Sequence, residues 1–251
     1  MARQKFIAGN WKLNLSIEEG TALVQGIAAF LAGRPTSAEV AVCPTALALA
    51  AVAKAAVGSP VGVGGQHCHW EEKGAFTGEV SASLLKNAGA KYVLLGHSER
   101  RQYFGETDAT VNKRLGAVLK QSLVPILCIG ETLAERQGNK LQQVLETQVK
   151  GALAGFTPEQ LATLVVAYEP VWAIGTGVTA TTAQAQEAHA FVRTVLRSVV
   201  GGLADRVRIQ YGGSVKPDNA KEILSQPDVD GALVGGAALK VADFTAIIAA
   251  A

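Results

Sequence analysis

The chain of 251 residues is poor in cysteine, and its cysteines have no paired spacing. Cys43, Cys68 and Cys128 are odd in number and lie far apart in the sequence, which is typical of neither a disulfide framework nor a zinc motif. Thiols used as small apolar residues are common in proteins of reducing compartments. We therefore expect a cytoplasmic protein.

Long apolar runs and a strong net charge are lacking as well. No run approaches the roughly 18 residues of a membrane span, and the N-terminal residues lack the apolar stretch of a signal peptide. The formal net charge of +2 is too small to suggest nucleic acid or a membrane surface as a partner. No repeat, low-complexity tract or linker interrupts the chain, so we expect one enzyme domain over residues 1–251.

Short apolar runs alternate with segments of helical spacing from end to end. The runs cover residues 6–9, 40–43, 61–63, 92–95, 126–129, 164–168, 207–211 and 232–234. Three pairs between them fit a capping box at a helix start: Ser16 with Glu19, Thr157 with Gln160, and Thr181 with Gln184. Eight such units predict a closed parallel (β/α)8 TIM barrel. An open doubly wound sheet shares the alternation, but it favours a glycine-rich turn after the first strand, which this chain lacks.

One carboxylate lies at the end of the sixth predicted strand. The apolar run 164–168 is rich in β-branched residues and leads into Glu169, and Pro170 stops the strand because proline has no backbone donor. The following loop carries Trp172 and Ile174 beside two glycines, a composition unlike that of a solvated connector. We predict a hydrophobic lid that folds over Glu169.

Polar residues follow other predicted strands too. Active sites of (β/α)8 barrels lie at the carboxyl ends of the strands, where this chain places Asn10, Lys12 and His97. His97 starts a segment of helical character, and the positive end of a helix dipole disfavours a cationic ring. Each residue also has a plainer interpretation: a turn cap for Asn10, a surface lysine for Lys12 and a helix cap for His97. Their matching positions favour a joint site, with Glu99 as a counter-charge for Lys12.

The last two predicted strands end in the glycine-bearing turns 212–214 and 235–236. Barrels frequently bind phosphate at this position through backbone N–H groups and a short helix N-terminus. Glycine lets the backbone approach an anion closely, and the Ser214 hydroxyl adds a donor. Each turn alone is a common connection, but the pair predicts a phosphate site.

Two further patterns are weaker. The segment 175–180 has the glycine spacing of a dinucleotide motif, but it starts several residues after its strand and lacks an acidic residue about 20 positions later. The segment 67–72 groups His, Cys and Glu, but adjacent side chains point apart and no second ligand pair has a zinc spacing. We therefore expect neither a nucleotide cofactor nor a metal ion.

Five motifs together resemble those of the triosephosphate isomerase family, in the family's order and over essentially the whole chain. They are residues 8–12 (AGNWK), 96–101 (GHSERR), 167–177 (AYEPVWAIGTG), 211–214 (YGGS) and 233–237 (LVGGA). The resemblance implies interconversion of dihydroxyacetone phosphate and D-glyceraldehyde 3-phosphate in glycolysis and gluconeogenesis. It also implies that no metal or organic cofactor takes part.

The resemblance further implies roles for single residues. Glu169 would be the base that removes a proton beside the carbonyl group, neutral His97 would polarise that carbonyl and move protons between the two oxygens, and Lys12 would stabilise the developing charge. The other implied substrate-binding residues are Asn10, Gly175, Ser214, Gly235 and Gly236. The implied supporting residues are Ser98, Glu99, Cys128 and Thr77.

The segment 66–79 resembles the family loop that inserts into the partner subunit of a homodimer, with Thr77 reaching towards the neighbouring site. Two residues depart from the family: Val178 stands where many relatives carry lysine, and Ala238 where serine is frequent. Another phosphate-binding barrel enzyme, such as an aldolase, is an alternative, as is a catalytically silent barrel used as a binding protein. No strand carries an obvious Schiff-base lysine, and the three implied catalytic residues are present, which favours the isomerase.

Overall fold

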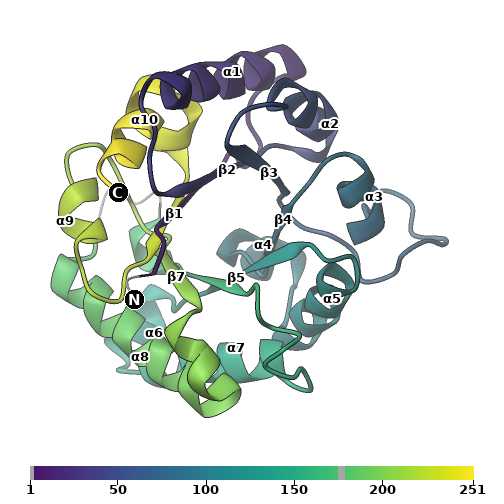
Figure 1. Cartoon of the computed structure of the whole chain (residues 1–251). Helices are drawn as coiled ribbons and strands as arrows, with labels where there is room; N and C mark the ends of the chain where they lie inside the picture. Colours follow the sequence, from purple (N-terminus) through teal and green to yellow (C-terminus); the bar gives the residue numbers. More distant parts are fainter. Residues whose placement is uncertain (1–2, 175–178) are drawn as a thin grey trace.

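The computed structural model describes residues 3–174 and 179–251 and shows a closed barrel of parallel strands (Figure 1). The strands follow one another around the barrel in sequence order, and β8 pairs back to β1. In order, β1 to β8 are Phe6–Asn10, Glu39–Cys43, Val61–Gly65, Tyr92–Leu95, Val124–Ile129, Val165–Tyr168, Arg208–Tyr211 and Gly231–Val234. The predicted TIM barrel is confirmed, and each of the eight apolar runs forms a strand.

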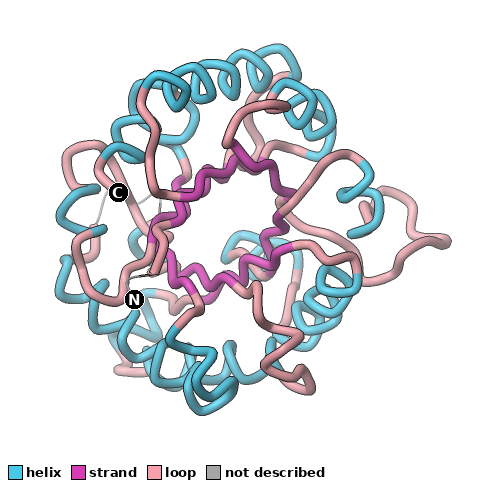
Figure 2. The backbone as a smooth tube through the Cα atoms, in the orientation of Figure 1, coloured by secondary structure: helices cyan, strands magenta, loops and turns pink. Residues whose placement is uncertain are grey.

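Helices form an outer ring around the strands, as Figure 2 shows. They are α1 (Ile17–Gly33), α2 (Ala46–Ala55), α3 (Ala82–Asn87), α4 (Ser98–Phe104), α5 (Asp108–Lys120), α6 (Leu133–Gln137), α7 (Leu141–Leu153), α8 (Thr182–Val200), α9 (Ala220–Leu224) and α10 (Val241–Ala249). The short 3₁₀ helices are η1 (Val171–Ala173), η2 (Gly201–Asp205) and η3 (Gly236–Leu239). Among the helices of the described residues, none has the length and apolar character needed to cross a membrane.

Capping side chains explain where two of the long helices begin. Ser16 before α1 and Thr181 before α8 form the predicted capping boxes, in which the hydroxyl and the side chain three residues later each accept a backbone N–H. The third predicted box does not start a helix. Thr157 and Gln160 exchange these hydrogen bonds, but residues 158–163 form turns. The chain enters β6 directly afterwards, and so short a segment cannot offset the cost of helix nucleation.

Side chains fill both the barrel interior and the layer between strands and helices. Successive residues of a strand point to opposite faces, so Phe6, Leu94 and Ile126 lie inside the barrel while Ile7 and Val93 pack against the helices. All five are fully buried. The barrel is therefore a packed core rather than a pore, and a functional site must lie at its ends.

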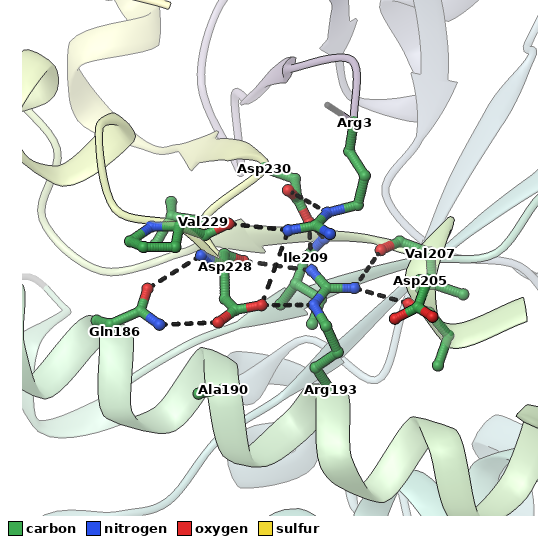
Figure 3. A network of polar contacts seen from close by, with 12 residues as sticks. Arg3, Gln186, Ala190, Arg193, Asp205, Val207, Ile209, Asp228, Val229 and Asp230 are labelled. Carbon is green, nitrogen blue, oxygen red and sulfur yellow. Dashed lines mark hydrogen bonds and ion pairs between the residues drawn. The ribbon is translucent and has the colours of Figure 1, made fainter. Parts of the chain in front are cut away.

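A buried ionic network lies at the amino-terminal end of β7 and β8, beside α8 (Figure 3). Arg193 of α8 donates to Asp228 Oδ1 at 2.7 Å and to Asp230 Oδ2 at 2.6 Å. Arg3 donates to Oδ1 of Asp230 at 2.6 Å, and the backbone N–H of Ile209 donates to its Oδ2 at 2.9 Å. The network thus joins α8, β7 and the segments that precede β1 and β8.

We expect Arg193→Met to lower the free energy of unfolding by about 3–5 kcal/mol, because it leaves buried carboxylates without their main cation. The Arg193 and Asp230 side chains are each only 4% exposed. Arg197→Met is the matched control on the same helix, since Arg197 pairs with Asp205 and both side chains are more than half exposed. This control should cost at most about 1 kcal/mol. Urea unfolding measures both, and equal losses would contradict the prediction.

Candidate active site

A cavity of about 690 Å³ opens at the carboxyl ends of the strands. Its wall contains polar or glycine residues that follow β1, β4, β6, β7 and β8. Those predicted from the sequence are Asn10, Lys12, His97, Glu169, Ser214, Gly235 and Gly236. Residues that are more than two hundred positions apart in the chain, such as Asn10 and Gly236, therefore face one volume, as the closure of a parallel barrel requires.

Glu169 is buried directly after β6, with 1% of its surface exposed. Its backbone N–H donates to the carbonyl of Ile129 at 2.7 Å, which extends the β5 to β6 pairing by one residue. Its carboxylate Oε2 accepts the backbone N–H of Ser98 at 3.0 Å, and Oε1 lies 3.1 Å from His97 Nε2. A buried carboxylate needs such donors, because burying a charge without them is costly. The contacts hold the carboxylate at the cavity wall.

His97 caps the N-terminus of α4 with its ring. Nδ1 accepts the backbone N–H of Glu99 at 3.2 Å, so this nitrogen carries no proton. The proton of the neutral ring therefore lies on Nε2, the nitrogen that faces Glu169. The neutral ring thus offers a hydrogen-bond donor to the cavity.

Lys12 lies in the loop after β1 with a left-handed backbone, φ being 52°. Its N–H donates to Asn10 Oδ1 at 3.0 Å. Its ammonium Nζ donates to Glu99 Oε1 at 2.5 Å, so Glu99 is the counter-charge expected from the sequence. Since α4 carries Glu99 next to its cap, one short helix holds both the imidazole and the partner of the ammonium group.

Glycines line the part of the wall formed by β7 and β8. A Cβ on Gly212 would lie 2.8 Å from Glu169 Cγ, so only glycine fits beside this carboxylate. Within residues 3–174 and 179–251, the nearest atom to a Cβ on Gly235 would be Lys12 Cε at 3.6 Å, and a Cβ on Gly236 would have no neighbour within 4 Å. The described part of the chain therefore does not require glycine at these two positions for packing. Because glycine has no side chain, the backbone there is open to a ligand in the cavity. The 3₁₀ helix η3 begins at Gly236, where its N–H groups can receive an anion.

Cys128 lies inside the barrel and is fully buried. Burial, together with the nearby charge of Glu169, raises the pKa of the Cys128 thiol well above its usual range. The thiol therefore stays protonated and acts as a donor towards the Glu169 carboxylate. Cys128 and Ser98 thus both hold Glu169 in place from behind the cavity wall.

The other predicted site residues lie elsewhere. Thr77 is exposed in the loop between β3 and α3, which extends outward at the right of Figure 1. Gly175, Val178 and the tip of the predicted lid lie outside the described residues. His67 and His69 have separate partners: His67 Nε2 lies 3.6 Å from Glu79 Oε2, while His69 stacks on its neighbouring tryptophan.

Glu131, directly after β5, has a role that the sequence analysis did not assign. Its Oε1 accepts the indole N–H of Trp172 at 2.8 Å and the hydroxyl of Tyr168 at 3.1 Å. Burial raises the pKa of the Glu131 carboxyl, and the hydrogen bonds from Trp172 and Tyr168 offset part of this rise. Glu131 therefore ties the start of the predicted lid to the barrel. Its position at a strand end was the available signal, but its partner could not be identified from the sequence.

Comparisons with known proteins agree with this geometry. Residues 5–251 match the family model for triosephosphate isomerase. The chain belongs to the triosephosphate isomerase family. It is 53% identical to the triosephosphate isomerase of Rhodopirellula baltica, with 100% of this chain and 99% of the relative covered. For the enzyme of Moorella thermoacetica the identity is 54%, with 98% of each chain covered.

The solved structures include a close match in shape. The crystal structure of triosephosphate isomerase from Bartonella henselae has a TM-score of 0.89 and 41% identity to this chain, with 98% of each chain covered. The family resemblance inferred from the sequence motifs is thus confirmed. The chain is a triose-phosphate isomerase, an enzyme of glycolysis and gluconeogenesis, rather than an aldolase or a silent barrel.

We expect Glu131→Leu to lower kcat/KM for glyceraldehyde 3-phosphate by roughly tenfold, because the Trp172 and Tyr168 donors lose their shared acceptor. Glu131→Gln keeps a carbonyl oxygen at this position and should retain most of the activity. Steady-state kinetics of the two variants check the prediction. Equal activity of Glu131→Leu and the unsubstituted enzyme would show that this anchor does not matter for the lid.

Proposed function

We propose that Glu169, His97 and Lys12 carry out the isomerisation through an enediolate. Glu169 removes a proton from the carbon next to the substrate carbonyl and returns it to the adjacent carbon. The Nε2 proton of His97 polarises the carbonyl, and the ring then moves a proton between the two oxygens. The ammonium group of Lys12 stabilises the negative charge that develops on oxygen.

The observation that carries this proposal is the buried pair of Glu169 and His97, whose Oε1 and Nε2 lie 3.1 Å apart at the cavity wall. The base and the proton donor come from different strands, and each has its other polar atom held by a backbone N–H of α4. A triose that enters the cavity takes the place of their mutual contact. One carbon then faces the carboxylate while the carbonyl oxygen faces the imidazole and Lys12.

We propose that the turns after β7 and β8 bind the substrate phosphate. The backbone N–H groups of Ser214, Gly235 and Gly236 would donate to it, together with Gly175, and Asn10 would contact the triose. The open space above Gly235 and Gly236 supports this assignment. The segment 170–178 would close over the substrate and exclude water, which strengthens the charge interactions and prevents loss of phosphate from the enediolate.

We expect Glu169→Gln to reduce kcat by about 10²–10⁴-fold, because the amide cannot accept the proton. Inhibition by inorganic phosphate should persist, since phosphate binding rests on other residues. Glu169→Asp keeps a base but withdraws it by one methylene group, so its kcat should lie between those of the unsubstituted enzyme and Glu169→Gln. A coupled assay with glyceraldehyde 3-phosphate measures all three. Turnover that survives in Glu169→Gln would assign the base to another residue.

We further propose a cytoplasmic homodimer that forms through the 66–79 loop, with Thr77 near the site of the partner subunit. Large apolar side chains exposed at the carboxyl ends of β1 to β3 support an interface there: Leu13 is 93%, Leu47 88% and Phe76 43% exposed. The three cysteines are free and buried, which supports a reducing compartment.

Light scattering should give twice the chain mass of 26.0 kDa for the unsubstituted protein. Phe76→Asp should shift the mass towards a single chain, because it places a charge in the proposed interface. Val57→Asp is the control: Val57 is 81% exposed but follows the end of α2, at the amino-terminal side of the barrel. A single-chain mass for the unsubstituted protein would reject the homodimer.

A further inference from the structure

The backbone of Lys12 is held in a conformation that it would not adopt unaided. A φ of 52° places this residue in the left-handed region, which is uncommon for residues other than glycine. Such conformations persist only where surrounding contacts determine them. On one side of Lys12 the contact is known: its N–H donates to Asn10 Oδ1 at 3.0 Å.

Gln66, the first residue after β3, supplies the contact on the other side. Its amide Nε2 donates to the carbonyl oxygen of Lys12 at 2.8 Å and to that of Cys43 at 3.0 Å. Cys43 ends β2, and its carbonyl also accepts the N–H of Trp11 at 3.1 Å. Both N–H groups of one side chain are therefore used to fix the loop after β1 against the ends of β2 and β3.

We propose that Gln66 is a positioning residue for the reaction, and that its amide fixes the direction of the Lys12 side chain. This proposal rests on the role proposed above for Lys12. Gln66 is not one of the described residues that line the cavity, so it acts on the substrate only through Lys12. Asn10 and Gln66 hold the backbone of Lys12, and Glu99 holds its ammonium end.

Loss of the Gln66 donors should move the ammonium group without removing it. The Lys12 carbonyl would lose a partner, and the backbone would relax towards a commoner region of φ. A rotation at the backbone displaces the distant Nζ atom relative to the substrate, even if its contact with Glu99 persists. Displacements of this kind weaken binding and catalysis together, because the charge no longer meets the substrate in the required geometry.

The test uses Gln66→Met, which keeps the length of the side chain and removes both N–H donors. We expect kcat/KM for glyceraldehyde 3-phosphate to fall roughly tenfold, mainly through a higher KM. The inhibition constant of inorganic phosphate should rise with it, because the Lys12 side chain lies beside the Gly235 turn that would bind the phosphate. Gln66→Leu also removes both donors and adds no charge, so it should show the same rise in KM and serves if the methionine variant does not fold. Light scattering checks that each variant keeps the mass of the unsubstituted protein.

Gln210→Met is the matched control. The Gln210 amide is fully buried and likewise donates to two carbonyl groups, those of Phe6 at 2.9 Å and Ala232 at 3.3 Å, but it does not hold Lys12. This substitution should lower the midpoint of urea unfolding and leave KM unchanged. An equal rise of KM in both methionine variants would show that the effect of Gln66→Met comes from a general loss of stability, and it would overturn the proposal.

A double variant separates this inference from the role of Lys12. If Gln66 acts through Lys12, Gln66→Met should not weaken phosphate inhibition any further in a Lys12→Met background. A further loss equal to that in the single variant overturns the inference. Unchanged kinetics of Lys12→Met would instead reject the proposed role of Lys12, whereas a strong defect in Lys12→Met beside unchanged kinetics of Gln66→Met would reject only the positioning role.

Discussion

Closure of eight parallel strands by backbone hydrogen bonds is the constraint on which the rest of the molecule depends. Because every strand runs in the same direction, all carboxyl ends lie at one rim and all connections must return along the outside. Lys12, His97 and Glu169 meet there although long stretches of chain separate them. The packed interior separates the two ends of the barrel, and the ionic network of Arg193 and Asp230 lies at the end opposite the cavity.

At the rim, backbone groups determine how the charged side chains are presented. The first turn of α4 offers one N–H to Glu169 and another to the ring of His97, so a single helix start sets both the carboxylate and the tautomer of the imidazole. In the loop after β1 the roles are reversed, because the side chains of Asn10 and Gln66 hold the backbone of Lys12. All of these contacts are made within the protein itself. Preorganisation of this kind is what makes charge stabilisation effective in an enzyme site.

The sequence allowed the strands and the rim residues to be predicted because both follow local rules. Apolar runs of β-branched residues marked the strands, and the polar residue after each run marked the rim. Two kinds of feature escaped these rules. The contacts of Glu131 with Trp172 and of Gln66 with Lys12 depend on which loops become neighbours after closure. The capping pair at Thr157 formed as expected, but the short path into β6 left no room for a helix.

The ionic network around Asp230 lies at the end of the barrel away from the cavity. Its members link the segments that precede β1 and β8, the two strands whose pairing closes the ring. Substitutions in this network change how firmly the ring is closed without altering any residue that faces the substrate. Substitutions at the amino-terminal end of the barrel can therefore adjust the thermal stability of the enzyme, while the geometry of the site at the carboxyl-terminal end stays the same.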